Sequence, residues 1–197
     1  MTDVFYIIGR DEMPRDIILK GGEELRMTLV CLPGTDADVH LDISLEGEGT
    51  DVDIAGLYLC PAAENVSVKV NLRHQNGSCT SRQLFKGIVG GTARAAFNGL
   101  IYVAPGAQKT KAFQENHTIL LSRDARVESS PQLEIYTDDV ECSHGATTGF
   151  LNEDELFYMR SRGITEAEAR RLQMISFISP VLSRLPEDVR TEILSRI

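Results

Sequence analysis

Hydrophobic and polar residues alternate one by one along several short segments in the first 140 positions. The clearest examples are residues 39–45 (VHLDISL) and 66–72 (VSVKVNL), with a shorter one at 52–54 (VDI). Alternation places apolar side chains on one face of an extended chain and polar ones on the other, as in a half-buried β-strand. Many of the apolar residues are β-branched, which favours strands further. The pattern therefore predicts a mainly β region up to residue 150.

The alternating segments also recur along the chain. Residues 39–45 and 66–72 match in pattern at an offset of 27 residues, and a glycine-containing turn follows each of them. Further units start near Ala95 and near Glu128. Strands that recur every 20 to 30 residues or so are typical of β-coils stacked into a solenoid. An antiparallel sandwich, with strands spaced by about 8 to 12 residues, is the alternative that the pattern alone leaves open.

After Gly149 the pattern becomes helical. Two segments begin with a capping residue followed three positions later by glutamate, which is the signature of a helix N-terminus. The sequence predicts a β domain over residues 1–150 and a small helical domain over 151–197. The predicted helix boundaries are Asn152 and Gly163 for the first helix, Thr165 and Pro180 for the second, and Pro186 for the start of the third.

Charge and composition exclude several classes of partner. The formal net charge is -9, from 29 acidic and 20 basic residues, which argues against binding to nucleic acid or to anionic lipid. No run of 18 apolar residues is present, so we expect no membrane span. No secretion signal is recognisable, and the four cysteines form no C-x-x-C pair. We therefore expect free thiols and a cytoplasmic protein.

The chemistry of the chain is concentrated in residues 131–150. Cys142 and His144 are two positions apart, so in a strand both side chains lie on the same face. A thiolate and an imidazole are plausible ligands for iron or zinc. Two ligands do not complete a metal site, and a buried cysteine beside a hydrogen-bonded histidine is the simpler interpretation of the same pair.

Acidic residues in the same stretch allow a second hypothesis. Glu134, Asp138 and Asp139 could serve as the acid and base of a metal-dependent or carbohydrate-active β-helix enzyme. Adjacent strand residues point to opposite faces, which disfavours Asp138 and Asp139 as a working pair. A solvated surface is the alternative interpretation of these carboxylates.

Several ordered pieces of the sequence are those of a known family. They are FNGLIYV at 97–103, PQLEIY at 131–136, CSHGAT at 142–147 and LFYMRSRGI at 156–164. Together they resemble the SufB/SufD family of iron–sulfur cluster assembly proteins. The run His-Gly-Ala-Thr, in place of His-Glu-Ala-Thr, is similar to the SufD branch. The resemblance extends from about Arg94 to the C-terminus, whereas residues 1–91 share only the alternating pattern.

The resemblance implies a fold and a function. The fold is a right-handed parallel β-helix with a small C-terminal helical domain, in a form about half the usual length of the family. The function is that of a non-catalytic scaffold or adaptor in a SUF-type system, with a transient iron–sulfur cluster and no tightly bound cofactor. His144 would lie at a subunit interface where the cluster is built, with Cys142 beside it.

The resemblance also implies two partners. One is a SufB-like paralogue or a second copy of the chain, which would pair with the β-helix. The other is a SufC-like ABC ATPase, which would dock on the helical tail. The residues expected to contact the ATPase are Leu156, Phe157, Tyr158, Arg160 and Arg162.

Overall fold

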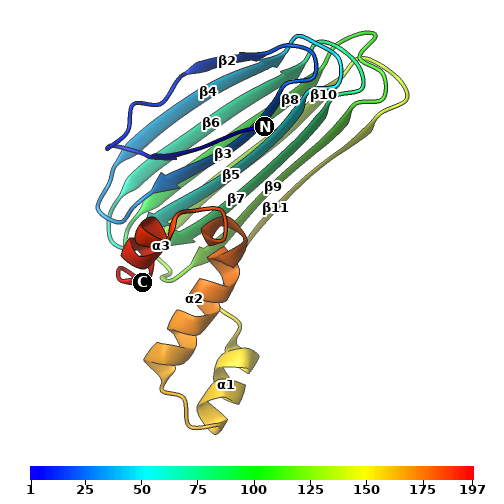
Figure 1. Ribbon diagram of the computed structural model, residues 1–197. Helices are drawn as coiled ribbons and strands as arrows, with labels where there is room; N and C mark the ends of the chain where they lie inside the picture. The colour runs from blue at the N-terminus through cyan, green and yellow to red at the C-terminus, as the bar shows by residue number, and fades with distance from the viewer.

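Two sheets of parallel strands face each other in the structure, and three helices follow them (Figure 1). The structure is a computed structural model that describes all residues, 1–197. The odd-numbered strands form one sheet, here the odd sheet, and the even-numbered strands form the other, the even sheet. The chain therefore passes from sheet to sheet and back in every coil. This is a parallel β-helix of about five coils, which confirms the predicted solenoid and excludes the antiparallel sandwich.

Each sheet is ordered along the β-helix axis. In the odd sheet the order is β1 (Thr2–Ile7), β3 (Glu24–Cys31), β5 (Asp51–Cys60), β7 (Thr80–Val89), β9 (Lys111–Leu120) and β11 (Glu141–Phe150). In the even sheet the order is β2 (Asp16–Leu19), β4 (Ala37–Leu45), β6 (Asn65–His74), β8 (Arg94–Val103) and β10 (Arg126–Ile135).

The register of β4 and β6 differs from the predicted repeat. Ala37 pairs with Val66, so the offset between these coils is 29 residues, and the predicted value of 27 is wrong by two. A shift by an even number keeps the same side chains on the core face, so alternation alone cannot detect it. The units expected near Ala95 and Glu128 are confirmed as β8 and β10.

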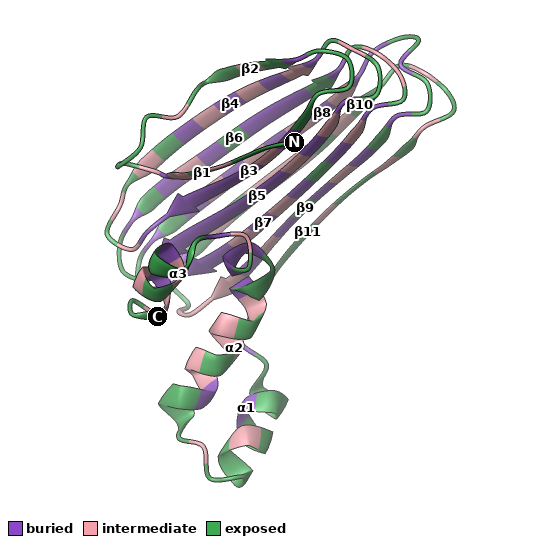
Figure 2. Ribbon diagram, in the orientation of Figure 1, coloured by how far each residue is buried: buried purple, intermediate pink, exposed green.

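The core lies between the two sheets. Alternate residues of the middle strands point inward, and among those that are fully buried are Leu41, Ile43, Ile54, Leu72, Phe85 and Phe97. Figure 2 shows the buried residues concentrated in the middle strands. Glycines on the odd sheet make room for aromatic rings of the neighbouring coil. A Cβ atom on Gly56 would lie 2.2 Å from the Phe85 ring, and one on Gly87 would lie 2.0 Å from the Tyr58 ring.

The helices are α1 (Glu153–Ser161), α2 (Glu166–Leu182) and α3 (Glu187–Leu194). The predicted caps are confirmed, since the Asn152 side chain accepts hydrogen bonds from the backbone of residues 154 and 155, and that of Thr165 accepts one from residue 168. Neither the length nor the hydropathy of α1, α2 or α3 would let it span a bilayer.

Helix α2 continues through Pro180, so the predicted end before this residue is wrong. Proline lacks the N–H that would bond the carbonyl group four residues earlier, at Ser176. The Ser179 hydroxyl donates to that carbonyl oxygen at 2.8 Å instead. Because only two helical residues follow Pro180, the loss of one backbone hydrogen bond near the helix end is tolerated.

The second half of the tail packs on the outer face of the odd sheet. Ile178, Val181 and Leu182 of α2, with Val189 and Ile193 of α3, share a hydrophobic cluster with residues of β3, β5 and β7. Those strands are consequently buried on both faces, as the continuous buried run at the end of β5 shows. Helix α1 and the first half of α2 instead extend away from the β-helix (Figure 1).

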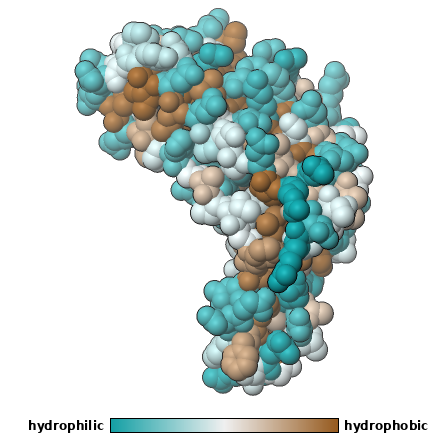
Figure 3. Space-filling model, turned by 180° about the vertical axis from the view of Figure 1, so that it is seen from behind, coloured by the Kyte–Doolittle hydropathy of each residue, from teal (hydrophilic) through white to brown (hydrophobic).

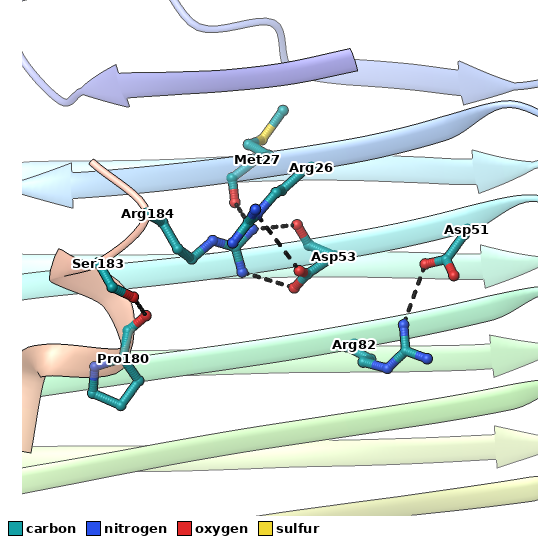
Figure 4. Close-up of polar contacts among 8 residues, drawn as sticks. All are labelled: Arg26, Met27, Asp51, Asp53, Arg82, Pro180, Ser183 and Arg184. Carbon is teal, nitrogen blue, oxygen red and sulfur yellow. Dashed lines mark hydrogen bonds and ion pairs between the residues drawn. The ribbon is translucent and has the colours of Figure 1, made fainter. Parts of the chain in front are cut away.

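An arginine beyond α2 joins the tail to the sheet (Figure 4). Arg184, whose side chain is 8% exposed, donates from Nη1 to Asp53 Oδ1 at 2.7 Å. Its Nη2 donates to the backbone carbonyl oxygens of Asp53 at 2.8 Å and Met27 at 3.2 Å. The guanidinium group therefore bridges β3 and β5 under the end of the tail.

Candidate functional site

The stretch from Pro131 to Phe150 forms most of the last coil of the β-helix. Strand β10 is an edge of the even sheet and pairs only with β8, while β11 is an edge of the odd sheet and pairs only with β9. Most residues of β11 are exposed. This end of the solenoid therefore presents open backbone edges and an uncovered inner face.

Pro131 fits its place on the free edge. The N–H groups of Arg126 and Tyr136 donate to carbonyl oxygens of the β8 coil, each at 3.0 Å. Because N–H groups of a parallel strand point alternately to its two sides, even-numbered residues of β10 bond β8 and odd-numbered ones face the open edge. Proline at position 131 thus removes no hydrogen bond from the sheet.

Cys142 and His144 lie on one face of β11, and that face continues the core. Cys142 pairs with Ala112 and His144 with Gln114 in β9, and both β9 side chains are completely buried. The alternation of β11 therefore directs Cys142 and His144 toward the interior of the coil. Cys142 is half-buried and His144 is exposed, since no further coil covers them.

Polar side chains fill the core directly below this pair. Gln83, Gln114 and His144 form one column across β7, β9 and β11, and Gln114 Nε2 donates to Gln83 Oε1 at 3.0 Å. The neighbouring column contains Cys142 above Ala112 and Ser81. Inward positions of a strand are usually apolar, so the sequence analysis did not recognise these polar residues as part of the core.

The donor set of the site is a thiol and an imidazole. Burial raises the pKa of the Cys142 thiol above its ordinary value, while a backbone hydrogen bond with Ala112 partly offsets this. The thiol is therefore protonated at neutral pH, and a metal ion would have to displace its proton. No group of three or more histidine, cysteine, aspartate or glutamate side chains is arranged to hold a metal ion. The pair suits iron chemically but does not form a complete site.

The remaining cysteines belong to the core. Cys31, Cys60 and Cys79 are buried, and all four cysteines of the chain are unpaired, as predicted. Burial raises the pKa values of the Cys31 and Cys60 thiols to about 12. These thiols are inert at neutral pH.

The acidic residues of the enzyme hypothesis are not brought together. Asp138 and Asp139 lie in the turn between β10 and β11, whereas the sequence analysis placed them on a strand. Asp139 has a φ of 60°. Glu134 is exposed on β10, and Glu141 forms an ion pair of 2.9 Å with Lys111. These carboxylates flank no common cleft.

A groove of about 740 Å³ crosses the starts of the even-sheet strands, away from this stretch. Two arginines, Arg94 and Arg126, and three acids, Asp36, Asp38 and Glu128, line it. Asp36 is engaged in the fold, since it accepts a hydrogen bond of 2.8 Å from the backbone of Asn65. The groove holds mixed charges rather than a pair of facing carboxylates.

The structure separates the tail residues that the sequence grouped together. Leu156 is buried against Leu151 and Ala169, so it cannot contact a partner. Phe157 and Tyr158 are 73% and 59% exposed. Each of the two arginines contacts another side chain of the tail. The Arg162 guanidinium group lies over the Tyr158 ring, 5.2 Å from its centroid, and Arg160 forms an ion pair of 3.6 Å with Glu166.

An apolar groove joins this tail to the last coil. It has a volume of about 500 Å³ and is lined by ten residues, among them Ile119, Phe150, Met159, Leu172 and Phe177. Figure 3 shows hydrophobic surface along the part of the molecule where the helices leave the β-helix. Sequence reasoning missed the groove because its residues come from β9, β11, α1 and α2.

Fold and site together define a β-solenoid whose last coil presents a thiol and an imidazole beside a helical tail. The family model of the SUF system FeS cluster assembly, SufBD core domain, matches residues 15–177 of the chain. This match covers well over half of the sequence, so the chain belongs to the SufBD family.

Curated relatives give the same family. The iron–sulfur cluster assembly protein SufD of Escherichia coli (strain K12) is 41% identical over 154 residues, which are 78% of this chain and 36% of the relative. SufD of Bacillus subtilis (strain 168) is 32% identical over 155 residues, with the same two coverages of 78% and 36%. A SufBD family protein of Mycobacterium leprae (strain TN) is 31% identical over 182 residues, or 88% of this chain and 46% of the relative.

The chain spans less than half the length of these relatives. The family match begins at residue 15, so the prediction that the resemblance starts near Arg94 is wrong.

Proposed function

We propose that this chain is a SufD-like scaffold or adaptor of a SUF-type iron–sulfur cluster assembly system and acts in the cytoplasm without catalysing a reaction itself. One observation carries the proposal: Cys142 and His144 share the inward face of an uncovered terminal coil and form only part of a ligand set. An incomplete set at an open end suits a site that a second chain completes. The cluster is then cargo that is bound transiently.

The partner at this end would be a SufB-like paralogue or a second copy of the chain. Ten-residue edge strands with unpaired N–H and C=O groups favour pairing with strands of another chain. Ile135, Tyr136 and Phe150, which are 40%, 57% and 60% exposed, add apolar surface at the same end. Such a partner would bury His144 and bring further ligands to it.

The second partner would be a SufC-like ABC ATPase on the helical tail. Phe157 and Tyr158 project from α1, and exposed aromatic side chains are frequent anchors of protein interfaces. Arg160 and Arg162 lie on the same helix end and add positive charge to a chain that is acidic overall. Leu156 supports this surface from inside rather than touching the partner.

His144→Ala tests the cluster site. With the partner proteins, iron and sulfide supplied, we expect cluster formation to fall at least tenfold, because one ligand of the shared site is lost. Ser143→Ala is the matched control, since Ser143 lies on the outer face of the same strand. Iron content and the visible absorption of the cluster are the measurements. A normal cluster yield in His144→Ala contradicts a ligand role.

Phe157→Ala combined with Tyr158→Ala tests the tail. Removal of residues 152–197 would uncover the apolar face of the odd sheet, so point substitutions on the exposed surface are the cleaner test. We expect affinity for the ATPase, measured by calorimetry, to fall at least tenfold. Tyr136→Ala is the control, because Tyr136 is equally exposed but lies at the end of the β-helix. Equal affinities of all three proteins would remove the tail from the interface.

A further inference from the structure

A buried hydrogen-bond acceptor without a donor lies directly below His144. The Gln114 side chain is completely buried, and its Nε2 donates to Gln83 Oε1 at 3.0 Å. Its Oε1 has no hydrogen-bond partner. An unsatisfied buried acceptor is costly, so this arrangement calls for a donor. The register of β9 and β11 places His144 beside Gln114 on the same inward face, one strand spacing away.

The Gln114 amide is held in place by the opposite wall of the coil. A Cβ atom on Gly99 of β8 would lie 2.3 Å from Gln114 Nε2 and 2.5 Å from Oε1. The amide therefore packs against the backbone of β8, where only glycine leaves enough space. Gly99 pairs with Pro131 of the last coil, so the amide lies one layer below the open end.

The neighbouring amide in β9 has no such free acceptor, although Gln83 Nε2, on the other side of Gln114, also lacks a partner. Asn116 Oδ1 accepts a hydrogen bond of 3.0 Å from the Tyr58 hydroxyl, and Asn116 Nδ2 donates to Ser129 Oγ at 2.9 Å. Its amide is thus satisfied on both sides. Gln114 has the same inward direction and is just as buried, but its Oε1 has no donor.

We propose that Gln114 is a positioning residue for His144, and this inference rests on the proposed role of His144 as a cluster ligand. Gln114 Oε1 accepts the hydrogen of one ring nitrogen when the imidazole turns into the coil. The hydrogen bond fixes the tautomer and leaves the lone pair of the other nitrogen for iron. Histidine ligands of metals usually donate their second N–H in this way, which orients the ring and makes it a better ligand.

The tautomer of His144 is the direct measurement. The chain has four histidines, so ¹⁵N-histidine labelling of the isolated protein gives few signals, and His144→Ala identifies the signal of interest. We expect one neutral tautomer of His144 to be favoured by about threefold or more, as a single hydrogen bond allows. Gln114→Met keeps the volume of the side chain but removes the acceptor, so the ratio should move to that of a histidine in an unfolded peptide.

Two further variants complete the experiment. Gly99→Ala leaves Gln114 in the sequence but displaces its amide, and it should shift the tautomer ratio in the same direction; it replaces Gln114→Met if that variant does not fold. Gln132→Met, an exposed glutamine on the outer face of β10, is the control and should leave the ratio unchanged.

The outcomes separate this inference from the proposed function. An unchanged ratio in both Gln114→Met and Gly99→Ala would overturn the positioning role. A ratio that shows a ring lone pair turned toward Gln114 would also overturn it, because the amide would then offer its N–H. If the tautomer depends on Gln114 while His144→Ala still forms clusters normally, the hydrogen bond stands and the ligand role fails.

Discussion

Burial of a single imidazole links the stability of the β-helix to pH. His74 is completely buried at the end of β6, and its Nε2 lies 2.9 Å from Ser81 Oγ. Burial lowers the pKa of His74 from 6.5 to about 4. Between these two values the unfolded chain binds a proton that the folded chain does not. The contribution of neutral His74 to stability is therefore complete above pH 6.5 and is lost as the pH falls toward 4.

His74→Leu should flatten this pH dependence. From pH 7.5 to pH 4.5, we expect the unmodified protein to lose about 2 kcal/mol more unfolding free energy than the variant, as the size of the pKa shift implies. Urea denaturation at the two pH values measures the difference. The variant is expected to be less stable at pH 7.5, because Ser81 loses its partner. The quantity to compare is therefore the loss of unfolding free energy between the two pH values, and not the stability at one pH. Equal losses in the two proteins would mean that burial does not lower the pKa of His74.

At the scale of elements, one side chain ties the tail to the β-helix. Arg184 lies just beyond α2 and contacts Asp53, which is 131 positions earlier in the chain. No local pattern in the sequence points to this pair. Its hydrogen bonds to two backbone carbonyl oxygens use the planar shape of the guanidinium group, which lysine lacks.

Arg184→Met should destabilise the protein by about 2 kcal/mol, because buried carbonyl oxygens and the Asp53 carboxylate lose a charged donor. Arg82→Met is a matched control one coil along the same sheet (Figure 4). Arg82 pairs with Asp51 at 3.4 Å, but its side chain is 57% exposed, so its loss should change stability by less than about 0.5 kcal/mol. Urea denaturation of both variants measures the difference, and equal effects would contradict the anchoring role.

Sequence patterns predicted the elements better than their arrangement. Alternation identifies the inward residues of a strand such as β6, because period two is a local property. It cannot fix the offset of 29 between coils, since the loops absorb two residues without reversing the faces. Alternation likewise placed Cys142 and His144 on one face. It could not show that Gln114 lies below His144, because that placement depends on the register between β9 and β11. The continuation of α2 through Pro180 rests on the nearness of the helix end and on a hydrogen bond from Ser179 to the freed carbonyl oxygen, which helix propensity does not include.

At the scale of the whole molecule, the last coil favours association. Along β11, the N–H of Glu141 bonds the preceding coil, so the N–H groups of even-numbered residues face the open edge. Strands of a second chain can bond these groups and cover the inner face at the same time. Self-association through this edge would give a symmetric dimer.

We therefore expect light scattering at micromolar concentration to give the mass of a dimer when no other partner is present. Ala146→Pro should shift the protein toward the monomer, because it removes an N–H from the open edge and leaves the bonds to β9. Asp3→Pro is the control at the other end of the solenoid, where β1 is the edge strand. A monomeric unmodified protein would leave a SufB-like chain as the expected occupant of this edge.

The stacking of coils also distributes local stability unevenly. Each coil of a solenoid is stabilised mainly by its two neighbours, and the coil of β10 and β11 has only one. Opening of this coil costs less free energy than opening of the middle coils, so its amide hydrogens should exchange with solvent before theirs. Cys142 and His144 thus belong to a terminal coil, which frays more readily than the middle coils. A partner that binds there would hold the coil closed, and ordering of the two side chains would then be coupled to assembly itself.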